Sequence, residues 1–285
     1  MKKKVSILLG FKYVKTRSLT DVFIEKGVEL ITDDQLTHIK EGSVEMEFID
    51  LGDITDRTNQ RFQRLSTARP SGKDTQQLFQ EILFLKNNVV SPTLLQHGIY
   101  LDCYRVGSTG EDQAFQVVFR PDEEARWSYV ASYPTQEEAI GSVNDLRQFL
   151  IHINVESEGV HIVEHILLRP EGEKSDHLDV PKDFYSFRIS VIFPSWTARL
   201  SNKDFQQLAK ETVRLNCPAH IYAEFYWLDF EKIRQFERLY MDWLEKKSGD
   251  RGSVRECNAA AKSLIDFLLA NREEPWGQEE EASRQ

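Results

Sequence analysis

The sequence is poor in cysteine, has no long apolar run and contains no phosphate-binding loop. Its three cysteines, Cys103, Cys217 and Cys257, are far apart and odd in number, which favours reduced thiols in a cytoplasm over a disulfide scaffold. No stretch approaches the roughly 20 apolar residues of a membrane helix. Residues 107–110 contain two glycines but lack the lysine and following helix of a phosphate-binding loop, so they indicate a turn.

Clustered positive charge is also scarce. The 285 residues include 36 Lys and Arg against 46 Asp and Glu, a net charge of −10, and the longest basic run is residues 2–4. This balance argues against wide binding to nucleic acid, which needs a clustered basic surface. A hydrophobic content of 40% with 11% aromatic residues excludes a disordered chain.

The first 15 residues resemble an export signal only superficially. Their apolar run, 5–11, contains a serine and a glycine, meets Lys12 at once and is not followed by a small-residue cleavage site. We therefore predict a β-strand over residues 5–14. Further expectations for the first half are strands at 44–48 and 99–105, a loop at 53–73 and a helix at 74–88.

The middle of the chain predicts a ββα unit. Residues 115–120 and 126–132 have the pattern of two strands joined by a short hairpin loop. Thr135 and Glu138 form a capping box that opens a helix with apolar residues at helical spacing as far as Ile153. The β-branched stretch 159–169 predicts a buried strand.

The last hundred residues give the clearest pattern, which follows a charged loop predicted at 171–182. Alternation predicts a strand with one strongly apolar face at 185–193 and a second strand at 219–228. A helix that begins at Ser201 or Asn202 separates them, so the two strands would be parallel if they are neighbours. Two more helices follow, from about residue 230 and over residues 254–268.

Together these elements predict an α+β protein. The expected organisation is an N-terminal mixed, β-rich region at 1–110 that folds by itself or on a partner, and the ββα unit with its buried strand at 111–170. A C-terminal β-α-β-α-α two-layer domain would occupy 183–272, and an acidic tail 273–285.

One motif suggests metal chemistry. His161, Glu164 and His165 match H-x-x-E-H, the inverted signature of zinc proteases, in which a helix places both imidazoles on one face. On a strand the two histidines, His161 and His165, would lie about 13 Å apart, too far to bind one metal ion together. The surrounding sequence predicts a strand, so we interpret Glu164 as part of a polar strand face.

Other candidate sites have simpler explanations. Residues 217–220, Cys-Pro-Ala-His, lack the companion ligands of a structural zinc site. Ser195 has no nucleophile-elbow motif around it. The aromatic residues between 222 and 243 form either a ligand platform or a packed core, and the core is the more common outcome.

Several motifs of the second half resemble a known family. These are Val-Glu-His-Ile-Leu-Leu-Arg-Pro at 163–170, Phe-Pro-Ser-Trp at 193–196, the 217–220 motif and Trp-Leu at 227–228. In this order, within residues 115–270, they resemble the C-terminal region of baseplate-associated proteins of phage-tail-like contractile injection systems. Those proteins are much longer, and the family provides no catalytic residues to carry over.

The resemblance implies a structural subunit, so we expect no enzyme and no cofactor. Its partners would be other baseplate, sheath, tube or spike subunits in a symmetric, multi-copy particle assembled in a bacterial cytoplasm, without nucleic acid or membrane insertion. Trp196, Tyr240 and Trp243 are the predicted interface residues. The alternatives are a zinc-dependent hydrolase that uses His161, Glu164 and His165, and a ligand-binding accessory module.

Overall fold

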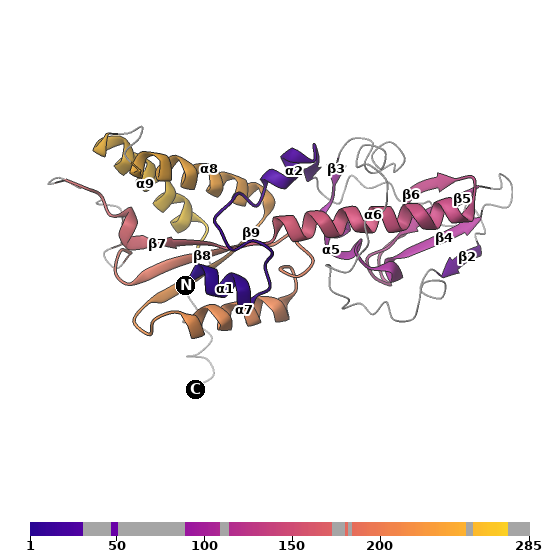
Figure 1. The fold of residues 1–285 in the computed structure, drawn as a ribbon, viewed down its shortest axis with the longest axis horizontal. Coiled ribbons are helices and arrows are strands. Elements are labelled where there is room, and N and C mark those ends of the chain that lie inside the picture. Colours follow the sequence, from indigo (N-terminus) through magenta and orange to yellow (C-terminus); the bar gives the residue numbers. More distant parts are fainter. Residues whose placement is uncertain are drawn as a thin grey trace. The chain divides into compact units, whose positions relative to one another are not determined.

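A computed structural model describes residues 1–30, 47–50, 89–108, 114–172, 180–181, 184–248 and 253–272 (Figure 1). They form two compact units. Unit 1 comprises Met1–Leu19, Glu158–Ser195 and Lys203–Gln285, and unit 2 comprises Thr20–Ser157 and Trp196–Asn202, counting only the described residues of each. The predicted ranges 1–110, 111–170 and 183–272 divide the chain differently, because residues 1–19 belong with the second half.

Unit 1 is built on a three-stranded sheet with the order β7-β8-β9. The short strand β7 (His161–Glu164) is antiparallel to β8 (Arg188–Pro194), and β8 is parallel to β9 (Tyr222–Leu228). The helix α7 (Lys203–Asn216) lies between β8 and β9 in the sequence. The predicted parallel pairing of these two strands is therefore confirmed, and the sheet gains β7 at its other edge.

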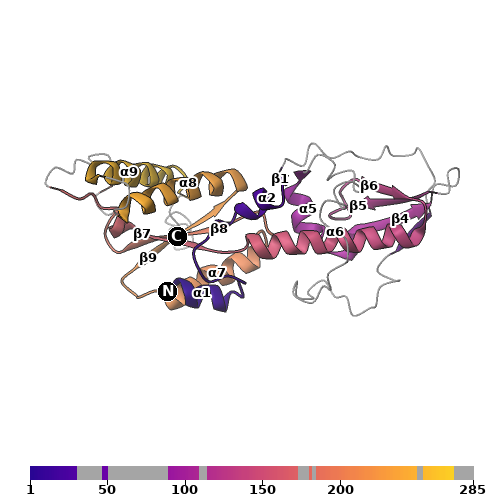
Figure 2. The ribbon, with the colours of Figure 1, turned by 45° about the horizontal axis from the view of Figure 1, so that its top comes forward.

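Helices cover both faces of this sheet. In Figures 1 and 2, α8 (Phe230–Lys247) and α9 (Val254–Ala270) lie over one face, whereas α7 and the short helix α1 (Lys2–Leu8) lie over the other. Unit 1 thus has three layers where two were predicted. The arrangement explains why β8 is buried from Ile189 to Phe193 without the alternation of a strand that has one solvent-facing side.

Unit 2 contains a four-stranded antiparallel sheet with the order β2-β4-β5-β6. The strands are β2 (Glu47–Asp50), β4 (Tyr104–Ser108), β5 (Phe115–Phe119) and β6 (Ser128–Tyr133). The long helix α6 (Gln136–Ser157) packs on β4, β5 and β6. The predicted ββα unit is confirmed. At the helix start the amide of Glu138 donates to the Thr135 hydroxyl over 3.2 Å, which is one of the two bonds of the predicted capping box.

Smaller elements complete unit 2. They are α2 (Asp21–Glu25), the parallel pair β1 (Glu29–Leu30) and β3 (Val89–Val90), α5 (Pro92–His97) and the 3-10 turn η4 (Leu101–Cys103). The side chain of the buried Asn154 connects α6 to α5 and to the segment that contains Ala198. Its amide donates to the carbonyl of Leu95 over 2.8 Å, and its side-chain oxygen accepts from the Ala198 amide over 2.7 Å.

The strand predicted at residues 5–14 is wrong, since residues 2–8 form the helix α1. Val5 and Leu9 are buried one helical turn apart, which is a helical rather than an alternating pattern. Gly10 follows with φ of +70° and donates to the carbonyl of Ile7, so it ends the helix in the left-handed conformation that glycine adopts easily. The two buried residues that show the helical pattern, Val5 and Leu9, are thus only one turn apart in the sequence.

Several other predicted strands have different bounds in the structure, and the one expected at 219–228 begins only at Tyr222. The strand expected at 99–105 begins only at Tyr104, after the turn η4, and the strand expected at 159–169 ends at Glu164. Residues 165–168 form a second 3-10 turn, η5 (His165–Leu168). The strand expected at 185–193 begins at Arg188, because Phe187 has φ of +53°, outside the extended region.

Some expectations fall outside the described residues: positions 44–46 of the strand predicted at 44–48, the loop at 53–73, the helix at 74–88, most of the loop at 171–182, and the acidic tail at 273–285. For the parts that are described, the α+β class is confirmed, as is the β-α-β-α-α order of residues 188–270. Within the same parts, no helix is long and apolar enough to cross a membrane.

Candidate functional site

The H-x-x-E-H segment crosses the junction between β7 and η5. His161 begins β7 opposite Ile192, Glu164 ends it opposite Ile189, and His165 is the first residue of η5. Both imidazoles are buried, and Glu164 is exposed. The segment is therefore not the helix that a zinc protease requires, and each histidine takes its own partners.

His161 belongs to a buried network centred on Glu237 of α8. Its Nε2 lies 3.0 Å from Oε1 of Glu237, and the same carboxylate accepts from the Ser18 hydroxyl over 2.8 Å and from the Leu19 amide over 2.5 Å. Because the carboxylate accepts, we place the imidazole proton on Nε2. Nδ1 is then a buried acceptor without a hydrogen-bond partner.

The environment of His161 favours its neutral form. Burial is the largest influence and lowers its pKa below the ordinary 6.5, while the hydrogen bond and the charge of Glu237 act in the opposite direction. The positive charges of Lys2 and Arg17 lower the pKa further. We therefore treat the pair as a neutral imidazole that donates to an ionised carboxylate.

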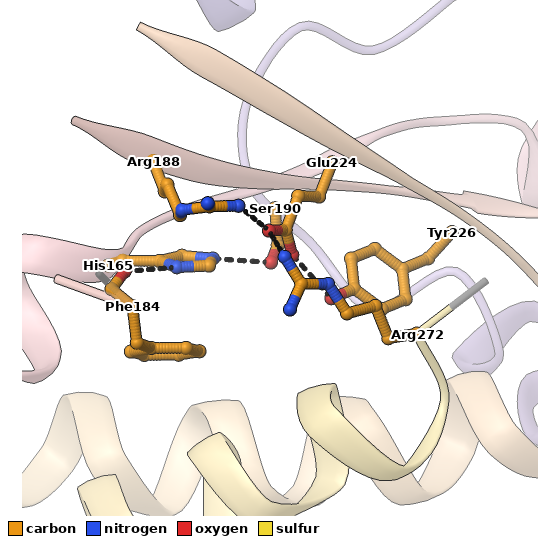
Figure 3. A network of polar contacts seen from close by, with 7 residues as sticks. All are labelled: His165, Phe184, Arg188, Ser190, Glu224, Tyr226 and Arg272. Atoms are coloured by element: carbon orange, nitrogen blue, oxygen red, sulfur yellow. Dashed lines mark hydrogen bonds and ion pairs between the residues drawn. The ribbon is translucent and has the colours of Figure 1, made fainter. Parts of the chain in front are cut away.

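His165 belongs to a second network, drawn in Figure 3. Its Nδ1 lies 2.8 Å from the carbonyl oxygen of Phe184, and its Nε2 lies 2.7 Å from the Ser190 hydroxyl. Since a carbonyl only accepts, Nδ1 carries the proton and Nε2 accepts from Ser190. The ring stacks on Phe184 with centroids 4.2 Å apart, and burial lowers the pKa of His165.

The second network is completed by an acidic residue of β9. Glu224, which is 8% exposed, receives two guanidinium groups on Oε1, from Arg188 at 2.7 Å and from Arg272 at 2.5 Å. The Tyr226 hydroxyl donates to Oε2 over 3.1 Å, and its pKa is raised, mainly by burial. Figure 3 shows these side chains converging from two strands and from Arg272, the second residue after α9.

The side chains of these networks that could react are buried and not exposed at the surface. A serine hydroxyl that donates to a histidine is the arrangement of an activated nucleophile, but Ser190 and His165 are both completely buried. Across the described ranges, no group of three or more His, Cys, Asp or Glu side chains could hold a metal ion. The contacts instead join β7, β8, β9, α8 and the end of α9, which is a structural task.

A cluster of exposed aromatic residues lies where β8 and β9 begin. Phe187 is 65% exposed and Tyr222 is 54% exposed, and the Tyr222 amide donates to the Phe187 carbonyl over 2.7 Å. The ring of His220 meets Phe187 edge-on at 5.5 Å, and the Arg188 guanidinium lies 5.0 Å from the centre of the Tyr222 ring. We call Phe187, Arg188, His220 and Tyr222 the aromatic cluster.

The predicted interface residues lie elsewhere. Trp196 is 3% exposed and packs edge-on against Phe23 within unit 2. In unit 1, Trp243 is 4% exposed, and Tyr240 is half-buried between Trp243 and Phe236. Their burial agrees with the core explanation of the aromatic residues, and an interface role for the three stays a prediction.

Sequence reasoning missed the residues that organise these sites. Alternation assigned Phe187 to the buried face of a strand, and nothing in its neighbours indicates a positive φ. Glu224 did carry a signal, since it is the single charged residue inside an otherwise apolar and aromatic strand. A buried acid of this kind requires cationic or hydrogen-bonding partners, although the sequence does not identify them.

Comparisons with known proteins add no identity to this geometry. Neither the comparison with protein-family models nor the search of curated proteins finds a match for the chain.

Proposed function

We propose that the chain is a structural subunit of a phage-tail-like contractile injection system, at a baseplate or adaptor position, and that it acts through protein–protein assembly. The resemblance of residues 163–170, 193–196, 217–220 and 227–228 to baseplate-associated proteins is the reason for naming this class. All but one position of these motifs, Trp196, belong to unit 1.

The observation that carries the assembly role is the aromatic cluster. Phe187 holds a large apolar ring in solvent from a left-handed backbone conformation, which costs a residue other than glycine roughly 1–2 kcal/mol. Strained, exposed residues that persist in a fold are candidates for function. Aromatic side chains and arginine are enriched at protein interfaces, which matches the composition of the cluster.

The proposed partners are other baseplate, sheath, tube or spike subunits, bound in a multi-copy assembly in the bacterial cytoplasm. The polar networks support this role indirectly. Arg188 pairs with Glu224 over 2.7 Å and its guanidinium lies 5.0 Å from the centre of the Tyr222 ring, so this network extends into the aromatic cluster. A rigid aromatic anchor loses little conformational entropy when it binds, and this favours a repeated interface.

Particle purification from the source bacterium tests the proposal. Contractile particles isolated by density centrifugation should contain the chain at a fixed ratio to the sheath and tube proteins, as measured by quantitative mass spectrometry. Replacement of the gene by one that encodes Phe187→Ala should reduce this ratio at least about tenfold, as expected when a hot-spot residue is truncated.

Met241→Ala is the matched control, because Met241 is an exposed apolar residue of unit 1 that lies outside the aromatic cluster and is 51% exposed. It should leave the ratio unchanged. If the wild-type chain is absent from particles, or no such particles form in the source bacterium, the proposal is wrong.

A further inference from the structure

The first 17 residues differ in charge from the rest of the chain. They contain five lysines and one arginine and no acidic residue, so they carry +6 and the remaining residues carry −10 − 6 = −16. Such an asymmetry is typical of a segment that binds an anionic surface. The same segment forms the helix α1, so the structure determines which of its residues face solvent.

The exposed side of α1 combines basic and aliphatic residues. At about 100° per residue, Lys3, Ile7, Lys4 and Leu8 follow one another around roughly 140° of the helix surface. All four are exposed, and Ile7 and Leu8 are each 57% exposed. The opposite side of α1 holds the buried Val5. We call the four exposed residues the α1 face.

Lys2 shows that the lysines of α1 are not equivalent. Its ammonium group donates to the Thr16 hydroxyl over 2.9 Å, and burial lowers its pKa to about 8. Lys2 therefore helps to attach α1 to the segment that follows it, whereas Lys3 and Lys4 extend into solvent. Lys15 adds a further exposed positive charge in that segment.

The neighbouring helix α7 also carries exposed aliphatic residues. α1 packs on α7, as the two views in Figures 1 and 2 show. On α7, Leu208 and Leu215 are 52% and 85% exposed, and their spacing of seven residues places them on one side of the helix. Both helices thus expose aliphatic side chains, and on α1 these alternate with lysines.

We propose that the α1 face binds an anionic lipid surface. Lysine ammonium groups would pair with headgroup phosphates, while Ile7 and Leu8 would enter the boundary between headgroups and acyl chains. The interleaving of charge and aliphatic groups favours lipid over a protein partner. Lysine is depleted at protein interfaces, whereas at a lipid surface its long stem lies along the acyl boundary and its charge reaches the headgroups.

This inference does not rest on the assembly role, because a chain that fails to enter particles can still bind lipid, and the reverse also holds. Flotation of the full chain with vesicles tests it. The vesicles are pure phosphatidylcholine, or phosphatidylcholine with roughly a third of phosphatidylglycerol, an anionic content that gives a strongly negative surface. The chain should float with the anionic vesicles and remain behind with the neutral ones. Added salt should weaken the binding by screening the charges.

Two double variants separate the charged and apolar contributions. Lys3→Gln with Lys4→Gln, and Ile7→Ser with Leu8→Ser, should each lower the affinity for anionic vesicles by about tenfold or more. The matched controls are Lys232→Gln and Met241→Ser, which make the same kinds of change at exposed positions of α8 and should bind like wild type. Thermal melting checks that each variant folds.

Three results would overturn the inference. They are the absence of binding to anionic vesicles, equal binding to neutral vesicles, and folded α1 variants that bind as tightly as wild type. A chain that ignores both kinds of vesicle but binds an acidic protein through Lys3 and Lys4 would likewise assign the α1 face to a protein partner instead.

Discussion

Nε2 of His161 lies 3.0 Å from Oε1 of Glu237, and both side chains are buried. Glu237 also accepts from Ser18 and Leu19, so one carboxylate fastens the end of the first segment to β7 and α8. A charged acceptor strengthens each of these bonds relative to a neutral one. In the described structure, His161 of the zinc-protease signature thus makes a buried contact that holds the parts of unit 1 together.

The first prediction concerns pH. Burial lowers the folded-state pKa of His161 and His165 below 6.5, so the unfolded chain binds more protons than the folded chain as the pH falls through that value. Stability contributed by the neutral imidazoles is present above about pH 6.5 and decreases below it. Urea denaturation between about pH 7.5 and about pH 5.5 should show this decrease.

The variant His161→Gln isolates one histidine in this experiment. Its amide nitrogen replaces Nε2 as a donor to Glu237 but does not titrate. The dependence of the unfolding free energy on pH should therefore become shallower than in wild type. An unchanged slope would mean that His161 has the same pKa in the folded and the unfolded chain, so that burial does not lower it.

The second prediction concerns Glu224. Glu224→Gln removes the charge that Arg188 and Arg272 share, and leaves two partly buried guanidinium groups without their carboxylate. We expect a loss of about 2–3 kcal/mol in the free energy of unfolding, less than for a fully buried pair because both arginines retain some solvent.

An exposed ion pair provides the control for this prediction. Lys262 and Asp266 are paired across one turn of α9, and both side chains are partly solvated. Asp266→Asn should change the free energy of unfolding by no more than about 0.5 kcal/mol. Equal losses of unfolding free energy for Glu224→Gln and Asp266→Asn would show that the buried ion pairs of Glu224 stabilise the fold no more than an exposed pair does.

Local signals predicted much of the fold. The hairpin of β5 and β6, the helix start at Thr135 and the parallel β8 and β9 all follow from patterns contained in a few neighbouring residues. The helix α1 was misassigned because a short apolar run carries no decisive period. Its buried positions become evident only once its neighbours are known.

The polar networks could not be predicted in the same way, because their partners are distant in the chain. His161 and Glu237 are 76 residues apart, and Arg188 and Glu224 are 36 apart. Sequence patterns identified His161 and His165 as unusual but assigned them to a metal motif or a polar strand face. Only the packing of α8 on the sheet determines which acid each cation or imidazole meets.

The third prediction compares two glycines of unit 2. A Cβ atom at Gly98 would lie 2.5 Å from the Leu94 carbonyl oxygen and 2.5 Å from a methyl carbon of Leu150. A backbone oxygen does not yield easily, so Gly98→Ala should cost about 2–3 kcal/mol. Gly141, inside α6, has nothing within 4 Å of its added Cβ.

Gly141→Ala should therefore stabilise the protein by about 0.5–1 kcal/mol, since alanine loses less conformational entropy than glycine in a helix. Thermal and chemical denaturation of the two variants should shift in opposite directions. Shifts of the same sign would contradict the close packing of α5 against α6 around Gly98.

The fourth prediction concerns Phe187. Glycine adopts a φ of +53° without the strain of a Cβ atom, and the phenylalanine ring is mostly in solvent, so Phe187→Gly should raise the free energy of unfolding by about 0.5–1 kcal/mol. Phe187→Ala, which removes the ring but keeps a Cβ atom, should leave the free energy of unfolding nearly unchanged.

Both Phe187 variants should lose incorporation into particles, because the ring is the proposed anchor. A residue that lowers stability yet is required for assembly is one kept for binding, as expected from the trade-off between stability and function. Destabilisation by Phe187→Gly in urea denaturation would mean that the ring supports the fold itself, and the strain argument for the aromatic cluster would fail.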